Sequence, residues 1–208
     1  MGIMKYSCNM KLVFASNNAH KLEEVRRILS PITVISMEEA GCVADIIEDG
    51  NTLEANSHIK ADFLWNWLNE NNTSNQYDGV IADDTGLEIT VLNGAPGVYT
   101  ARWAGEPACD ANNRAKALRE LHGKINRDAQ FRTVITLITK SHGEEQMSGI
   151  VRGIIHTEEK GGNGFGYDQL FIPEGYEKTF AELPAEIKNK ISHRARALTA
   201  LKNKLKQR

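Results

Sequence analysis

DGVIADDTGL, at residues 78–87, is the stretch around which the rest of the chain is organised. Its apolar run at 80–82 predicts a buried strand, and the adjacent carboxylates Asp83 and Asp84 follow it directly. At the carboxyl end of such a strand the two acids are held close together, where open α/β sheets bind ligands, and Gly86 permits a turn. Neighbouring like charges repel unless a cation lies beside them, and carboxylate oxygens suit Mg²⁺. The stretch indicates a metal and phosphate site, with a solvated Asp-Asp-x-Gly turn as the alternative on these residues alone.

The composition is that of an ordinary globular chain and excludes several classes of protein. The 208 residues are 41% hydrophobic and 25% charged, with a formal net charge of -2, enough for one sizeable core or two closely joined lobes. That charge gives no general attraction to nucleic acid or to an anionic membrane, so we expect neither as a partner. Three scattered cysteines without a CxxC pair argue against a zinc site or a disulfide framework.

Targeting and domain signals are few. No apolar run reaches membrane-spanning length and the first residues lack a signal-peptide core, so we expect a cytoplasmic protein. Residues 1–10 carry three methionines and no periodicity, which predicts a disordered or vector-derived lead. Residues 11–208 show no repeat or linker, and we expect them to form one α/β domain with two lobes.

A strand, a polar loop and a helix are predicted near the N-terminus. The apolar run at 12–15 is followed by SNNAHK at 16–21, after which apolar residues recur at helical spacing over 22–29. Such a loop offers backbone N–H groups at a helix N-terminus together with hydroxyl, amide and ammonium groups, a combination that suits phosphate oxygens. Simple capping of the helix by the Ser-Asn-Asn stretch is the alternative.

The next segment predicts a strand at 33–35 and a helix from about Leu53 to Asn69, with Thr52 as its N-cap. Asn56 and Lys60 are four residues apart and therefore share a face of that helix. An acidic stretch that contains Glu48 precedes the helix. Glu48 and Lys60 offer a further metal ligand and a further phosphate contact, although a solvated lysine is the commoner explanation for Lys60 alone.

Beyond the paired acids, residues 87–92 predict another strand or a short extension, and NGAPG at 93–97 predicts a turn. Asp110 is expected to cap a helix that runs to Leu121. Alternating side chains over 129–155 predict a long hairpin.

GGNGFGYD at 161–168 interleaves four glycines with two aromatics and an acid. Glycine lets backbone approach a ligand, and an exposed aromatic can stack on a planar base; a flexible loop anchored by Phe165 is the alternative.

Two helices are predicted at the C-terminal end. One starts at Pro184 and carries Lys188, and Ser192 caps the last, which begins with His193 and Arg194. Cations at a helix N-terminus are opposed by the helix dipole, so their position there needs an anion or a carboxylate to explain it.

These pieces together closely resemble the inosine triphosphate pyrophosphatase family over residues 11–201. The resemblance rests on six motifs in the family's order: Ser16-x-Asn18-x-x-Lys21, Glu48-x-Gly50-x-Thr52-x-x-x-Asn56-x-x-x-Lys60-Ala61, Ala82-Asp83-Asp84-Thr85-Gly86-Leu87, Gly94-Ala95-Pro96-Gly97-Val98-Tyr99-Thr100-Ala101-Arg102, Gly164-Phe165-Gly166-Tyr167-Asp168, and Ala181-Glu182-Leu183 followed by Lys188 and Ser192-His193-Arg194. The departures are Gln169 where proline is usual, Leu53 where phenylalanine is common, and Asn17 and His20 where some members have glycine.

The resemblance implies an elongated, two-lobed α/β fold with a long central mixed sheet flanked by helices, with substrate between the lobes and a homodimer. It also implies Mg²⁺-dependent hydrolysis of deaminated purine nucleoside triphosphates (dITP, ITP, XTP, dXTP) to the monophosphate and pyrophosphate. Two other functions stay open: a related pyrophosphatase that acts on modified pyrimidine nucleotides, and a nucleotide-binding protein without activity.

The resemblance further implies roles for individual residues. Asp84 is implied as the base that activates water and, with Glu48, as a Mg²⁺ ligand. The implied substrate contacts are the phosphate loop Ser16, Asn17, Asn18, Ala19, His20 and Lys21, then Lys60 and Thr85, and the nucleoside set Phe165, Gly166, Tyr167, Asp168, Lys188, His193 and Arg194.

The implied bases differ from adenine at position 6. Their keto oxygen accepts hydrogen bonds from Arg194, protonated His193 or backbone N–H groups, whereas the amino group of adenine would leave donors unpaired. Guanine shares the keto oxygen, so GTP must be discriminated near position 2, where Asp168 is the only acid of the motif that could take part.

Overall fold

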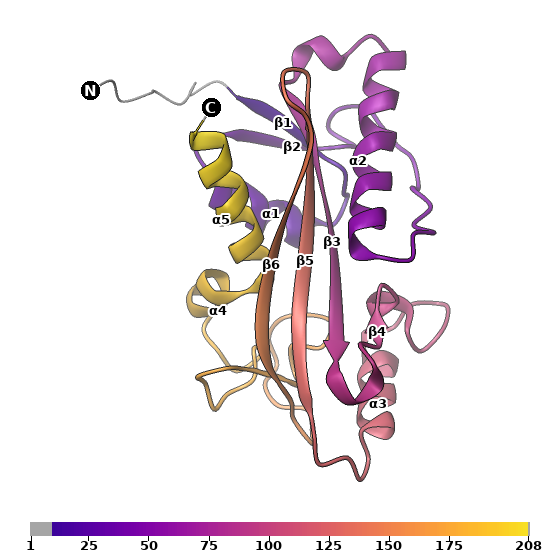
Figure 1. Ribbon diagram of the computed structural model, residues 1–208, viewed down its shortest axis with the longest axis vertical. Coiled ribbons are helices and arrows are strands. Elements are labelled where there is room, and N and C mark those ends of the chain that lie inside the picture. The colour runs from indigo at the N-terminus through magenta and orange to yellow at the C-terminus, as the bar shows by residue number, and fades with distance from the viewer. Residues whose placement is uncertain (1–9, 208) are drawn as a thin grey trace, which may run out of the picture. The chain divides into compact units, whose positions relative to one another are not determined.

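The computed structural model describes residues 10–207 as a mixed α/β fold (Figure 1). Within these residues the strands are β1 (Lys11–Phe14), β2 (Thr33–Ser36), β3 (Gly79–Ile89), β4 (Pro96–Gly97), β5 (Asp128–Thr139), β6 (Gly143–Ile155) and β7 (Phe171–Pro173). The helices are α1 (Ala19–Leu29), α2 (Leu53–Glu70), α3 (Asp110–Glu120), α4 (Ala185–Ile191) and α5 (His193–Lys206). The expected α/β class is confirmed, and no helix among the described residues is long and apolar enough to span a bilayer.

All of these strands belong to one mixed sheet, in the order β2-β1-β3-β5-β6-β7, with β4 paired to β3. β1 runs parallel to both β2 and β3, and its register places Leu12 beside Gly79 and Phe14 beside Ile81. The β3–β4 and β6–β7 pairs are antiparallel. The mixed sheet expected from the sequence is therefore present.

The chain divides into two compact units, each assembled from separate segments. Unit 1 contains the residues up to Asp84, Thr133–Gly149 and the residues from Ala195, and unit 2 contains Thr85–Arg132 and Ile150–Arg194. Of the lead expected at 1–10, residues 1–9 lie outside the described residues. The carbonyl of Met10 accepts a hydrogen bond from the Thr33 amide at 2.9 Å, so this residue already belongs to the sheet edge.

The core of unit 1 lies on both faces of its part of the sheet. Figure 1 shows α2 on one side of these strands and α5, with α1 behind it, on the other. Because side chains alternate along a strand, neighbouring residues of one strand serve both layers. Leu12, Phe14 and Ile81 pack with α1 and α5, whereas Val13, Val80 and Ala82 pack with α2.

The core of unit 2 lies on one face of its strands. Its members come from β3, β5, β6 and β7, from α3 and the residue after it, and from the segment at 167–183. They are Leu87, Ile89, Ala117, Leu121, Ala129, Phe131, Val151, Ile155, Tyr167, Leu170, Phe171, Phe180 and Leu183. Alternate residues of β5, such as Gln130 and Arg132, face the other way and stay partly exposed. This half of the sheet is therefore covered on one side by α3 and the 165–183 segment.

Most elements predicted from the sequence are found with small shifts. Thr52 is the N-cap of α2, and its hydroxyl accepts from the Ala55 amide at 3.0 Å. The helix ends at Glu70, one residue beyond the predicted end. The predicted hairpin is β5 and β6, and the predicted turn is present, with Asn93 at φ 53° and Gly94 at φ 86°.

The strand predicted to end at the two acids continues instead to Ile89. Asp83 and Asp84 lie in its interior and Gly86 makes no turn, so the predictions of a strand end and of a turn are wrong. Of the two predictions for residues 87–92, the short extension is found, as far as Ile89, and the separate strand is not. The reason is long-range pairing: β1 ends beside Ile81, but β5 remains as a neighbour of β3. A strand that keeps one partner does not need to end where it loses the other.

Gly79 lets β3 and β5 approach closely, and we predict that Gly79→Ala destabilises the protein. A Cβ atom there would lie 2.3 Å from the Ile138 carbonyl oxygen and 3.0 Å from Thr139 Cγ2. Since a backbone atom cannot move aside cheaply, we expect a loss of about 2 kcal/mol in the free energy of unfolding, measured by urea denaturation. Gly162→Ala is the control, because a Cβ atom at Gly162 meets nothing within 4 Å. Equal stability of the two variants would contradict the close approach.

Candidate active site

The two adjacent acids of β3 point to opposite faces of the sheet. Asp83 follows the face of Ile81, toward α1, and its Oδ1 lies 2.9 Å from Lys21 Nζ. Asp84 follows the face of Ala82, toward α2, and its Oδ1 lies 3.5 Å from Lys60 Nζ. The expectation of one close carboxylate pair is therefore wrong, because alternation along the strand separates the two side chains. Each acid instead has a lysine of its own from a different helix.

Lys60 joins Asp84 to the acid predicted as its fellow ligand. Its ammonium lies 2.7 Å from Glu48 Oε2 as well as 3.5 Å from Asp84 Oδ1. Two oxygens that contact one nitrogen cannot be further apart than these two distances together. Glu48 and Asp84 thus contact the same ammonium group, and their role as joint metal ligands stays a prediction.

Burial and charge act against each other in this cluster. Burial alone would lower the Lys60 pKa, but the carboxylates of Asp84, Glu48 and Asp83 outweigh it, so that the Lys60 pKa is raised above its ordinary 10.5. Burial raises the pKa of Asp84 above its ordinary 3.8, Lys60 opposes this rise and Glu48 adds to it. Asp84 is therefore a more basic carboxylate than an exposed one.

The donor atoms of this cluster fit Mg²⁺. Within residues 10–207 no three His, Cys, Asp or Glu side chains form a group that could hold a metal ion, so the protein offers the two carboxylates of Glu48 and Asp84. Mg²⁺ commonly takes one or two carboxylates and completes its shell with water and substrate phosphates. The place between the two carboxylates already attracts a cation, since Lys60 Nζ lies there.

The predicted phosphate loop is fastened by its own side chains. Asn18 is the N-cap of α1, and its Oδ1 accepts from the Lys21 amide at 3.1 Å, while Ser16 Oγ accepts from the Asn18 amide at 3.2 Å. Capping, the alternative reading of this loop, is thus confirmed for Asn18. His20 and Lys21 lie in the first turn of α1, and the pairing with Asp83 accounts for a cation near that helix start.

Asn56 is a site residue that the sequence interpretation did not include. Its side chain is 1% exposed, its Oδ1 accepts from the Gly50 amide at 2.8 Å, and its amide group lies close enough to Asp84 to act on the pKa of that carboxyl. Asn56 therefore links the loop that carries Glu48 to Asp84. The available signal was its position four residues before Lys60 on the same helix face.

Ser57 holds α2 against the strands beside this cluster. Its hydroxyl donates to the Ala82 carbonyl at 3.1 Å and accepts from the Thr136 amide at 3.0 Å, with Thr136 Oγ1 at 2.8 Å. The residue is fully buried. These bonds fix the helix next to the residue that precedes Asp83.

The glycine-rich loop of unit 2 exposes one aromatic ring. Phe165 is 40% exposed, and its amide donates to Asp168 Oδ2 at 2.8 Å. Lys188 Nζ lies 2.5 Å from the same oxygen and 5.0 Å from the centre of the Phe165 ring. Phe165 is therefore held through its backbone and by a neighbouring ammonium while part of the residue stays exposed.

Other members of the predicted nucleoside set are buried. The Tyr167 hydroxyl donates to the Thr100 carbonyl at 3.0 Å, and burial raises the pKa of this phenol, so its side chain belongs to the core and only its backbone is available to a ligand. The His193 ring stacks on Phe131 at 4.7 Å. Asp168, His193 and Arg194 are all less than a tenth exposed.

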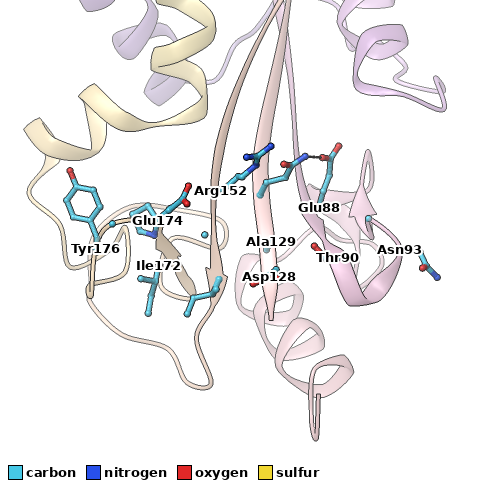
Figure 2. A pocket seen from close by; sticks show the side chains of 15 residues that line it. Glu88, Thr90, Asn93, Asp128, Ala129, Arg152, Ile172, Glu174 and Tyr176 are labelled. Atoms are coloured by element: carbon cyan, nitrogen blue, oxygen red, sulfur yellow. Dashed lines mark hydrogen bonds between the residues drawn. The ribbon is translucent and has the colours of Figure 1, made fainter. Parts of the chain in front are cut away.

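A concave region of unit 2 contains none of the predicted site residues. Figure 2 shows this hollow, of about 910 Å³, on the less covered face of the strands, where Gln130 donates to Glu88 at 2.6 Å. Arg152, Glu174 and Tyr176 surround it. Its lining mixes acids, one arginine and apolar side chains, and no cluster of catalytic groups lies in it.

Comparison with known proteins identifies the family. A profile of the Ham1 family matches residues 12–204. The chain belongs to the Ham1 family. It is 47% identical over 194 residues to the dITP/XTP pyrophosphatase of Flavobacterium johnsoniae, which covers 92% of this chain and 96% of that protein. It is 44% identical over 200 residues to the dITP/XTP pyrophosphatase of Clostridium perfringens, which covers 94% of this chain and 97% of that one.

Solved structures agree with this membership of the Ham1 family. The Staphylococcus aureus Ham1 protein matches with a TM-score of 0.85 and 38% identity, over 95% of this chain and 98% of that chain. A protein from Mycobacterium abscessus named nucleoside-triphosphatase / dITP/XTP pyrophosphatase matches with a TM-score of 0.73 and 37% identity. This match covers 92% of the present chain and 98% of that chain. The resemblance to inosine triphosphate pyrophosphatases is confirmed by these relatives.

In this Ham1 chain the predicted site residues fall into two groups by unit. Unit 1 carries the phosphate and metal group, which is Ser16, Asn17, Asn18, Ala19, His20, Lys21, Glu48, Lys60 and Asp84. Unit 2 carries the nucleoside group, which is Phe165, Gly166, Tyr167, Asp168, Lys188, His193 and Arg194, and it begins with Thr85. The roles of these residues stay predictions.

We predict that Lys60→Met destabilises this Ham1 protein. The change leaves buried Asp84 without the ammonium that opposes its desolvation. Breaking a buried ion pair from one side costs about 3 kcal/mol or more, and the partly exposed Glu48 places this case at the low end. Since the Lys60 pKa is raised on folding, its stabilisation is fully present below the ordinary 10.5 and is lost only as the pH rises through the folded-state pKa.

Urea denaturation at pH 7.5 measures this loss. Lys140→Met is the matched control, because Lys140 is exposed and its ammonium donates to Asn75 Oδ1 at 2.8 Å. We expect a change within about 0.5 kcal/mol for this variant. A Lys60→Met protein as stable as its control would show that the cluster does not rely on this ammonium.

Proposed function

We propose that this protein hydrolyses deaminated purine nucleoside triphosphates, such as dITP and XTP, to the monophosphate and pyrophosphate, and so removes them from the nucleotide pool. The observation that carries the proposal is the buried cluster of Glu48, Lys60 and Asp84 in unit 1, which also holds the loop at residues 16–21. Relatives of 42–47% identity that are named dITP/XTP pyrophosphatase support the substrate class.

Mg²⁺ is the proposed cofactor, held by Glu48 and Asp84. When bound, it would neutralise charge on the phosphates and make a water molecule more acidic. Lys60 and Lys21 supply further positive charge for the triphosphate tail, because ammonium groups are strong donors to phosphate oxygens. Backbone N–H groups at the start of α1 add to this anion site.

Asp84 is the proposed general base. Its buried carboxylate takes a proton from the attacking water while the water oxygen bonds to the α-phosphorus. The bond between the α-phosphorus and the oxygen that bridges to the β-phosphorus then breaks, and pyrophosphate leaves with that electron pair. A pKa raised by burial suits this role, since a base accepts a proton more readily as its pKa approaches the working pH.

Base choice is assigned to unit 2. The exposed ring of Phe165 offers a stacking face, and Arg194 or protonated His193 would donate to the keto oxygen at position 6. Adenine carries a donor at that position and is disfavoured, since two donors that face each other in a dry pocket stay unpaired. The carboxylate of Asp168 bonds Phe165 and Lys188 in this structure, so a role for it at position 2 would require an exchange of partners.

A homodimer and a cytoplasmic location complete the proposal. Cys42 and Cys109 are both free thiols, which fits a reducing compartment. Light scattering coupled to size exclusion measures the mass of the particle, and a mass near that of one 23.1 kDa chain would refute the dimer.

A panel of triphosphates tests the proposed function. We expect Mg²⁺-dependent release of pyrophosphate from dITP, ITP and XTP and far slower release from ATP, followed by a coupled pyrophosphate assay with and without EDTA. Activity confined to modified pyrimidine triphosphates would support the related pyrophosphatase instead. Tight binding of ITP without any pyrophosphate would indicate a nucleotide-binding protein.

Asp84→Asn tests the base. The amide keeps the shape of the side chain but cannot accept the proton, so we expect kcat for dITP to fall by about 10²- to 10⁴-fold while the circular dichroism spectrum is unchanged. Asp45→Asn, at an exposed acid, is the control and should keep full activity. Near-normal turnover of Asp84→Asn would remove this residue from the mechanism.

A further inference from the structure

One residue of the nucleoside loop has both of its backbone polar groups bound by helix side chains. The Gly166 amide donates to Asp110 Oδ2 at 2.7 Å, and its carbonyl accepts from Arg114 Nη1 at 2.9 Å. Gly166 lies at φ 60°, where the left-handed conformation favours glycine. Asp110 and Arg114 are four residues apart on α3 and so share one face of that helix.

The sequence predicts a different role for Asp110, as the N-cap of α3. It was expected to cap α3, but the N-cap is Cys109, no side chain caps the helix there, and Asp110 is the first helical residue. A carboxylate in the first turn gains from the helix dipole wherever it points. The bond to Gly166, 56 residues away, is therefore additional to that local effect, and the capping prediction is wrong.

Arg114 also contacts the segment before the loop, at Glu159. Its Nε lies 2.9 Å from Glu159 Oε2, and the Arg114 side chain is only 13% exposed. One guanidinium thus contacts both the segment that leads into the loop and the loop itself. Nη1 donates a hydrogen bond to the Gly166 carbonyl, whereas Nε meets Glu159 as an ion pair without hydrogen-bond geometry.

α3 is itself firmly attached to unit 2. Ala117 and Leu121 lie in the core, and buried Asn113 accepts from the Ala104 amide at 2.7 Å and donates to the Ala101 carbonyl at 2.8 Å. A helix fixed in this way is a rigid base for Asp110 and Arg114. The loop is consequently held by α3 at Gly166 as well as by Asp168 at Phe165.

Phe165 lies between these two attachments. Asp168 binds the Phe165 amide, and α3 binds the next residue, Gly166, at both of its polar groups. A Cβ atom at Gly164 would lie within 2.1 Å of Asp168 Oδ2, so the backbone before Phe165 is packed against the same carboxylate. These contacts fix the backbone around Phe165, a residue that is 40% exposed, and Lys188 Nζ lies 5.0 Å from the centre of its ring.

We propose that Asp110 and Arg114 are positioning residues that hold the Phe165 ring ready for the purine base. This inference rests on the proposed function and names residues of the same site. Neither side chain needs to contact the substrate. They reduce the conformational freedom that the loop would otherwise lose when a base binds, so they improve affinity for the nucleoside part and leave the phosphate part unaffected.

The experiment measures the two parts of the substrate separately in the full-length enzyme. Asp110→Ala and Arg114→Ala should each raise KM for dITP by about tenfold with kcat nearly unchanged, because stacking is gained equally in the ground and transition states. Inorganic tripolyphosphate, which has no base, should inhibit these variants and the parent with the same inhibition constant. Asp110→Asn, which keeps an oxygen acceptor for Gly166, should restore most of the affinity.

Asn112→Ala is the control, an exposed side chain on the same helix that should leave KM unchanged. In the double variant Asp110→Ala with Arg114→Ala, KM for dITP should rise by less than the product of the two single increases, because both side chains bind the same residue, Gly166. An unchanged KM in both alanine variants would overturn the proposal, as would an equal weakening of dITP and tripolyphosphate. If one alanine variant does not fold, the KM of the other alanine variant for dITP decides: a rise of about tenfold supports the proposal, and an unchanged value overturns it.

Failure of this inference and failure of the proposed function give different results. If the parent enzyme releases no pyrophosphate from dITP, the function is wrong. If the parent is active and the α3 variants keep its KM, only the positioning role is wrong.

Discussion

Alternation along β3 is the constraint on which the site depends. Two acids adjacent in sequence take opposite faces of the sheet, and each meets a lysine from the helix that covers its own face. Had both carboxylates shared a face, their repulsion would have needed one cation to neutralise two charges in a buried place. Division between the faces gives Asp83 a structural partner in Lys21 and leaves Asp84 beside Lys60 and Glu48. The strand thus places the Lys21–Asp83 pair and the Lys60–Asp84 pair on opposite faces of the sheet.

The face of β3 that carries Asp84 is held by buried polar contacts from α2. Asn56 binds the backbone of the Glu48 loop and lies near Asp84, and Ser57 binds the strand that carries that acid. Both residues are almost fully buried. Buried polar groups are costly unless satisfied, and once satisfied they specify one arrangement. Ser57 is satisfied on both sides and ties α2 to the strands, and Asn56 Oδ1 ties α2 to Gly50, whereas Asn56 Nδ2 has no hydrogen-bond partner within the described residues.

Much of the fold could be predicted because it follows from local sequence patterns. Helical spacing located α1, α2 and α5, alternation located the β5–β6 hairpin, and Asn18 and Thr52 were recognisable as caps. The motif order also indicated the family. What local pattern could not supply was pairing: the end of β3 depends on which neighbour stays beside it, and β5 is distant in sequence. Asp110 was predicted as an N-cap because that prediction uses only the residues next to the helix start. Its actual partner, Gly166, lies 56 residues later in the sequence.

The position of Lys60 has one more consequence, for how the site behaves between substrates. A protein whose acids await a metal usually carries an unbalanced negative charge when the metal leaves, but here an ammonium already lies against both carboxylates. The Mg²⁺ proposed for this site would have to displace a tethered ammonium that never diffuses away, and phosphate oxygens that arrive with the ion would draw the lysine toward themselves.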